Sequence, residues 1–208
     1  MNALDVFAAL MTSHPGLPLS PALPIQVLYG CHAGETCTVI GKGPSLRHLR
    51  RDMIPDGLVI TLNHALLKII ALGIDQDDRV VYSMQKDGFC CDVPSGVALI
   101  IHQHESRNVL LDHRPRYLFD NPADFGLEVH DASLPTTIKI AELFGCTNVM
   151  LISMDSMTTG DLRRVDDGCT PIAPDPNYLR YAKRAAKLIE QSTVIQGVTW
   201  VTPQEEEA

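Results

Sequence analysis

Aromatic residues are scarce in this chain. Phe, Trp and Tyr make up 5% of its 208 residues, with a single tryptophan, while hydrophobic residues of all kinds make up 45%. A core with so few rings has to be filled by aliphatic side chains, and aliphatic strands buried on both faces are typical of a parallel sheet covered by helices. The length allows one domain or two small ones.

An excess of positive charge is also missing. The formal net charge is −8, and no basic stripe of the kind that binds duplex nucleic acid runs along the sequence. No apolar run approaches the roughly 18 residues that a membrane-spanning helix needs. Residues 1–11 lack the basic start of a secretion signal. We therefore expect no nucleic-acid partner, no membrane span and a cytoplasmic location.

Cysteines in a C-x-x-C spacing are absent as well. Six cysteines are spread along the chain, and Cys90 and Cys91 are adjacent, which would strain a disulfide between them. Cys146 lies in an apolar stretch, so we expect a buried thiol there. The pattern indicates a reduced chain and not a disulfide framework.

The first 30 residues differ from the rest. Residues 4–11 are apolar, and Pro15, Pro18, Pro21 and Pro24 follow, which disfavours both helix and strand pairing. We expect an N-terminal arm over residues 1–30 and a single nucleotide-binding domain over residues 31–208. The arm either wraps its own domain or docks on a second subunit, and the second alternative predicts a homo-oligomer.

From residue 36 onward, strand and helix signals alternate. Short apolar or β-branched runs predict strands at 36–40, 57–62, 79–84, 97–102, 116–119, 148–153 and 198–201. Longer periodic stretches predict helices at 45–52, 63–72, 134–144 and 177–191. This alternation predicts an α/β fold: a doubly wound, mostly parallel, Rossmann-like sheet with helices on both faces.

The segment V-I-G-K-G-P-S-L at residues 39–46 forms the first strand-to-helix turn. Gly41 and Gly43 have no Cβ, so their backbone can approach a phosphate closely. Pro44 presets φ for the first helical turn, whose free N–H groups favour an anion, and Ser45 adds a hydroxyl. The turn also follows the first strand of the domain, where doubly wound folds bind ligands. A plain strand–helix corner is the alternative.

This turn resembles the opening of the bacterial lipooligosaccharide sialyltransferases. It is also similar to a wider set that shares their nucleotide-binding core, including flagellin-modifying glycosyltransferase-like proteins and archaeal-type hydroxymethylpterin pyrophosphokinases. A second similar segment is T-L-N-H at residues 61–64. A third runs from A-S-L-P-T-T at residues 132–137 through A-E-L-F-G-C-T-N-V-M-L-I-S-M-D, which ends at Asp155. The three segments occur in the order found in the family.

The resemblance implies a nucleotide pocket with Asp155 at its rim. The residues that it implies for the pocket are Gly41, Lys42, Gly43, Ser45, Asn63 and Ser133. The chain also departs from the family. Lys42 stands where the family has a small polar residue, no histidine follows His130 to serve as the family's general base, and its two phosphate-binding tyrosines have no counterpart. Arg163 and Arg164 could bind the departing phosphate instead.

Other candidates follow from position alone. Asp155 closes a buried strand, where catalytic residues gather, although a helix or loop cap is the alternative. Lys86 and Asp87 leave another strand and could hold a substrate or phosphate, with a solvated turn as the alternative. His130, just before Ser133, is the candidate substrate-facing histidine. His102 and His104 lack further ligands at a suitable spacing, so we predict no metal site from them.

Three functions are open at this point. The first is a glycosyltransferase that binds a nucleotide-sugar, of the CMP-sugar type by resemblance. The second is a pyrophosphokinase-like enzyme that uses ATP and magnesium, for which Asp75, Asp87 and Asp155 would be the acidic residues. The third is a catalytically degenerate nucleotide-binding or assembly module.

Overall fold

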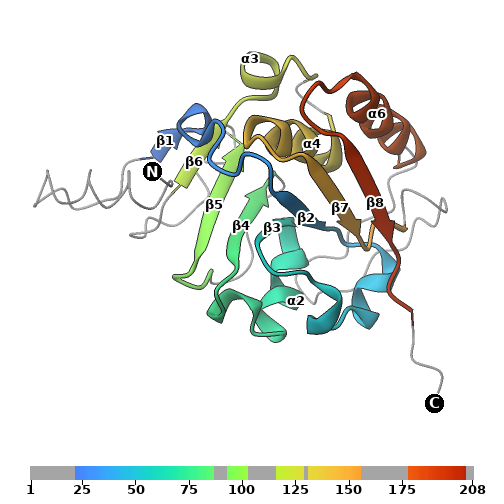
Figure 1. The fold of residues 1–208 in the computed structure, drawn as a ribbon. Helices are drawn as coiled ribbons and strands as arrows, with labels where there is room; N and C mark the ends of the chain where they lie inside the picture. The colour runs from blue at the N-terminus through green and yellow to red at the C-terminus, as the bar shows by residue number, and fades with distance from the viewer. Residues whose placement is uncertain (1–21, 87–92, 103–115, 129–130, 156–177, 205–208) are drawn as a thin grey trace, which may run out of the picture.

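The computed structural model describes residues 22–86, 93–102, 116–128, 131–155 and 178–204. These residues form a single eight-stranded sheet in the order β1-β6-β5-β4-β3-β2-β7-β8 (Figure 1). Every pair of neighbouring strands is parallel. The predicted α/β class with a parallel sheet is confirmed.

The strands are short and aliphatic. The sequence predicts β2 to β8 to within one residue at either end. The strands are β1 (Ala22–Pro24), β2 (Thr36–Ile40), β3 (Leu58–Leu62), β4 (Val80–Gln85), β5 (Val97–His102), β6 (Arg116–Phe119), β7 (Asn148–Ile152) and β8 (Gly197–Val201).

Helices cover both faces of this sheet, as predicted. On one face, α4 (Ser133–Leu143) packs against α6 (Tyr178–Gln191), and α4 contributes to a core cluster with β2, β3, β4 and β7 (Figure 1). On the opposite face, α2 (Leu66–Ala71) contributes to a second cluster. A short helix, α3 (Asn121–Phe125), follows β6. None of the helices in the described ranges is long and apolar enough to span a membrane.

The start of the described chain corrects the predicted domain boundary. Residues 22–30 belong to the sheet domain and not to a separate arm, because β1 pairs with β6 at the sheet edge. Ile25 and Leu28, in the 3-10 turn η1 (Ile25–Leu28), are fully buried. Pro24 is accommodated because an edge strand pairs on one side only. The predicted arm contact with a second subunit falls on residues 1–21, which lie outside the described residues.

The helix predicted at residues 45–52 is also wrong. Two 3-10 turns stand there, η2 (Pro44–His48) and η3 (Arg51–Met53), separated by extended backbone at Leu49 and Arg50. Leu46 in η2 and Leu49 just after it are both buried, so this segment contributes to the core although it is not an α-helix.

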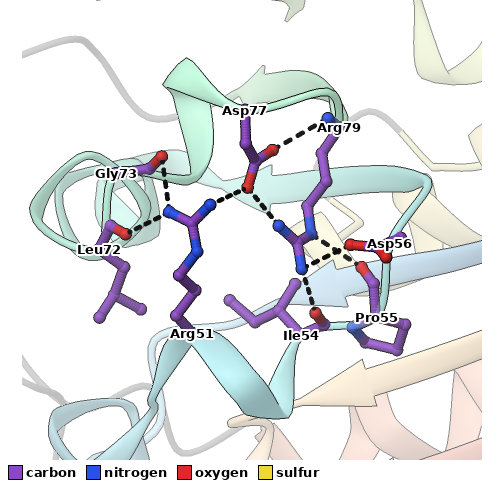
Figure 2. Close-up of polar contacts among 8 residues, drawn as sticks. All are labelled: Arg51, Ile54, Pro55, Asp56, Leu72, Gly73, Asp77 and Arg79. Atoms are coloured by element: carbon purple, nitrogen blue, oxygen red, sulfur yellow. Dashed lines mark hydrogen bonds and ion pairs between the residues drawn. The ribbon is translucent and has the colours of Figure 1, made fainter.

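At the amino edge of the sheet, Arg51 links η3 to the turn after α2 (Figure 2). Its Nη1 donates to the carbonyls of Leu72 and Gly73, at 3.2 and 3.1 Å, and its Nη2 donates to Asp77 Oδ2 at 2.9 Å. Gly73 has φ of 66°, the left-handed conformation expected after a helix end. Arg51 thus satisfies carbonyls that the end of α2 leaves open.

Arg79 makes the second half of this arrangement, and we call Arg51, Asp77 and Arg79 the amino-edge clamp. Arg79 pairs with Asp77, and it donates to the carbonyls of Ile54 and Pro55 at 2.8 and 3.0 Å. Its Nη2 also lies 2.9 Å from Asp56 Oδ1 (Figure 2). The clamp therefore ties together the segments that lead into β3 and β4.

Three of the cysteines lie in the described ranges, and all three are free thiols. Cys37 and Cys146 are fully buried, as predicted for Cys146, and Cys31 is partly buried. Burial raises the pKa of the Cys31 thiol to about 12 and that of Cys37 well above its ordinary value. The Cys31 and Cys37 thiols are therefore protonated at neutral pH.

Candidate functional site

The strand order reverses between β2 and β7. From β2 the chain adds β3, β4, β5 and β6 on one side, and it then places β7 on the other side of β2. Because all strands are parallel, their carboxyl ends meet at one edge, and ligands of doubly wound folds bind at such a reversal. The glycine turn follows β2 and residues 153–155 follow β7, so both lie at this point.

The two glycines of the turn pack against the chain itself. Gly41 N–H donates to the carbonyl of Ile152 at 2.9 Å, and Gly43 N–H donates to that of Ser153 at 2.8 Å. A Cβ on Gly41 would lie 2.7 Å from the Ser153 oxygen, and one on Gly43 would lie 2.8 Å from it. We had expected the open space beside the glycines to admit a phosphate, but segment 153–155 fills it.

Asp155 occupies the start of η2. Its carboxylate accepts the Ser45 N–H at 3.0 Å and the Ser45 hydroxyl at 2.5 Å, and both residues are buried. A carboxylate at this position satisfies the donors that would otherwise face an anion. Pro44, at the first position of η2, has no N–H to offer. In this structure Asp155 therefore anchors the turn.

Asn63 begins the turn after β3 and connects three elements. Its φ is 48°, a left-handed conformation that Asn tolerates better than most residues. Its side-chain nitrogen donates to Ser133 Oγ at 3.3 Å, and its side-chain oxygen accepts the N–H of Lys86 at 2.8 Å. The structure thus brings together three predicted site residues, from β3, α4 and the end of β4.

Ser133 is the first residue of α4. The preceding residue, Ala132, provides no side-chain cap, and no acidic residue lies in the first turn. Pro135 has no N–H, so the amides of Ser133 and Leu134 are the ones that carry the partial positive charge of this helix start beside Asn63.

Lys42, between the two glycines, contacts His64. The distance from Lys42 Nζ to His64 Nδ1 is 3.2 Å. An ammonium can only donate, so this contact gives His64 Nδ1 the accepting role. Lys42 and His64 follow the ends of adjacent strands, β2 and β3, and the contact places the Lys42 side chain against the residue after Asn63.

Three residues of this edge were missed as candidates. His64 lies next to Asn63, Gln85 is the last residue of β4, and Ser153 follows β7; all three are buried. Ser153 has φ of 56°, and its hydroxyl has no hydrogen-bond partner in the described part of the chain. A polar residue at the end of an apolar strand was the available signal for all three.

Four of the predicted site residues lie outside the described residues: Asp87, His130, Arg163 and Arg164. His104 does too. His102 packs its ring edge-on against Phe119, with 5.1 Å between ring centroids. Within the described ranges, no group of three or more His, Cys, Asp or Glu side chains is arranged to hold a metal.

In comparisons with known proteins, no family model, curated protein or solved structure matches the chain at a significant level.

Proposed function

We propose that the protein binds a nucleotide or nucleotide-sugar at the carboxyl edge of its sheet. One observation carries this proposal: Lys42, Asn63 and Ser133, singled out from separate sequence segments, are linked at this edge through the contacts Lys42–His64 and Asn63–Ser133. They combine a cation, an amide and an uncapped helix start. These groups suit a ligand that carries a phosphate and polar hydroxyls.

The phosphate position in this proposal differs from the one that the glycine turn suggested. The Ser45 donors are engaged by Asp155, so the phosphate is assigned to Lys42 and the start of α4. The glycines then have an indirect role, since they let segment 153–155 pack closely and so fix the position of Lys42.

We propose glycosyl transfer from a nucleotide-sugar of the CMP-sugar type as the activity, based on the family resemblance. A binding module without catalysis is the second candidate, and the contacts of Asp155 favour it. The predicted catalytic carboxylate is engaged by Ser45, an arrangement typical of a structural role.

A thermal-shift screen tests the binding proposal. CMP, UDP, GDP, ATP and the CMP-, UDP- and GDP-sugars are each added to the wild type and to Lys42→Gln. We expect at least one ligand to stabilise the wild type, and we expect Lys42→Gln to weaken its binding about tenfold, the size expected for a charged contact to phosphate.

Lys139→Gln is the matched control for this screen. Lys139 lies within α4 and pairs with Glu142, so its loss removes the same charge away from the strand ends. No shift with any ligand would refute the proposal, and so would an equal effect of the two lysine variants. Release of the nucleotide leaving group from the nucleotide-sugar that binds separates catalysis from binding alone, because both transfer to an acceptor and hydrolysis by water release it.

A further inference from the structure

Gln85 is a buried polar residue at the same edge that neither the fold nor the proposed phosphate contacts explain. It is 2% exposed and ends β4. Its Nε2 donates to the carbonyl of Asn63 at 3.3 Å and to Ser83 Oγ at 2.6 Å. Ser83 in turn accepts from Thr61 Oγ1 at 3.1 Å. A buried polar chain therefore runs along β3 and β4 to Asn63.

These contacts fix the orientation of the Gln85 amide. A carbonyl oxygen can only accept, so the group that faces the Asn63 carbonyl has to be the NH₂. Oε1 is then directed elsewhere, and it is buried without a hydrogen-bond partner in the described part of the chain. A buried acceptor left in this state is destabilising, and native proteins rarely keep one unless something else satisfies it.

We propose that Gln85 Oε1 accepts a hydrogen bond from the nucleoside part of the bound nucleotide; this inference rests on the proposed function. The partner has to be a donor. The phosphate oxygens of a nucleotide are acceptors and negatively charged, so an amide oxygen repels them. Amino groups of a base and hydroxyl groups of a ribose are donors, and they satisfy it.

The inference sets the direction of the ligand across the sheet. Lys42 follows β2 and Gln85 ends β4, with β3 between them. Two strand spacings amount to about 10 Å, a separation that one nucleotide can span. The nucleoside therefore lies over the end of β4, the phosphate over the end of β2, and Asn63 between them.

Analogues of the best-binding nucleotide test this assignment. Each analogue lacks one donor of the nucleoside: the base amino group, the 2′-hydroxyl or the 3′-hydroxyl. In the wild type, we expect one analogue to bind about tenfold more weakly than the parent. Gln85→Met should bind the parent about tenfold more weakly and should no longer discriminate against that analogue.

Two control variants keep the result specific. Lys42→Gln should weaken all ligands and keep the discrimination, because its contact is to phosphate. Thr61→Val disturbs the same polar chain two residues before Asn63 and should also keep the discrimination.

Gln85→Glu covers the case in which the methionine variant does not fold. At pH 6 a buried carboxyl group beside the Asn63 carbonyl is protonated, so it donates there and keeps one acceptor oxygen. We expect this variant to retain the wild-type discrimination between parent and analogue.

The outcomes separate the two proposals. Absence of nucleotide binding in the wild type overturns the proposed function and this inference together. Binding with an unchanged dissociation constant in Gln85→Met overturns the inference alone. The inference is also overturned if each analogue loses the same affinity in the wild type as in Gln85→Met. Gln85 Oε1 then makes no hydrogen bond to the ligand.

Discussion

The two edges of the sheet use polar residues in opposite ways. At the amino edge, the clamp residues bind each other and backbone carbonyls, and within the described ranges none of their side-chain atoms is both buried and unpartnered. At the carboxyl edge, Asn63 and Ser153 have left-handed backbones, and Ser153 Oγ and Gln85 Oε1 lack partners in the described chain. The amino-edge clamp stabilises the fold, whereas the carboxyl edge combines left-handed backbone with buried polar atoms that lack a partner in the described chain, which suits the ligand proposed for it.

Loss of Arg79 should have the largest effect. Arg79→Met keeps the aliphatic stem but removes one of the two arginine partners of Asp77, and the Arg79 and Asp77 side chains are both largely buried. We expect the free energy of unfolding to fall by about 3 kcal/mol, because the Asp77 carboxylate keeps only Arg51 and the carbonyls of Ile54 and Pro55 lose their donor. Urea denaturation measures this change.

Arg50→Met is the matched control for Arg79→Met. Arg50 pairs with Asp52 at the surface, where the two side chains are 40% and 71% exposed. Its loss should cost less than about 1 kcal/mol. If the two variants lose equal stability, the amino-edge clamp stabilises the fold no more than an exposed ion pair does.

Asp155 is the residue for which both a structural role and a catalytic role have been considered. Asp155→Ala leaves the Ser45 N–H and hydroxyl without their buried acceptor, and we expect a loss of about 2 kcal/mol in the free energy of unfolding. Asp155→Asn should lose less, because the amide can accept one of these bonds and donate in the other. Urea denaturation of both variants checks the difference.

Measuring turnover in the same two variants distinguishes a catalytic role of Asp155 from a structural one. If the chain transfers a sugar and Asp155 acts in that step, Asp155→Asn should abolish turnover while it retains most of the stability. If Asp155 only anchors the turn, Asp155→Asn should retain both. Turnover that falls only in proportion to the unfolded fraction, in both variants, would exclude a catalytic role.

The comparison also explains what the sequence could predict. β2 to β8 are short, mainly apolar or β-branched runs between turn signals, so the parallel sheet and the meeting of their carboxyl ends follow from the sequence. Asp155 could be placed at that edge for the same reason, whereas Asn63 and Ser133 were assigned to the pocket by the family resemblance alone. β1 could not, because the prolines around it argue against pairing, and only its edge position makes the pairing possible.

Contacts between distant segments were beyond such reasoning. Ser45 and Asp155 are 110 positions apart, and Arg51 and Asp77 are 26 apart. A single sequence does not indicate which donor meets which acceptor. For this reason the glycine turn was predicted to face a ligand, whereas its amides bind the segment after β7.

The smallest expected effect concerns Ser153, and it has the opposite sign. Its left-handed backbone costs energy for a residue with a Cβ, so Ser153→Gly should relieve strain. The greater backbone entropy of glycine in the unfolded chain offsets part of the gain. We expect a net increase of about 0.5 kcal/mol in the free energy of unfolding, measured by urea denaturation.

Ser153→Ala separates strain from the unpartnered hydroxyl. Alanine keeps the Cβ and the strain but removes Oγ, so any stabilisation by alanine comes from loss of a buried polar atom alone. If Ser153 serves the ligand, both variants should weaken nucleotide binding, although glycine makes the protein more stable. A loss of stability in Ser153→Gly would instead show that the carboxyl edge holds no releasable strain at this residue, and the contrast between the edges would then rest on hydrogen bonding alone.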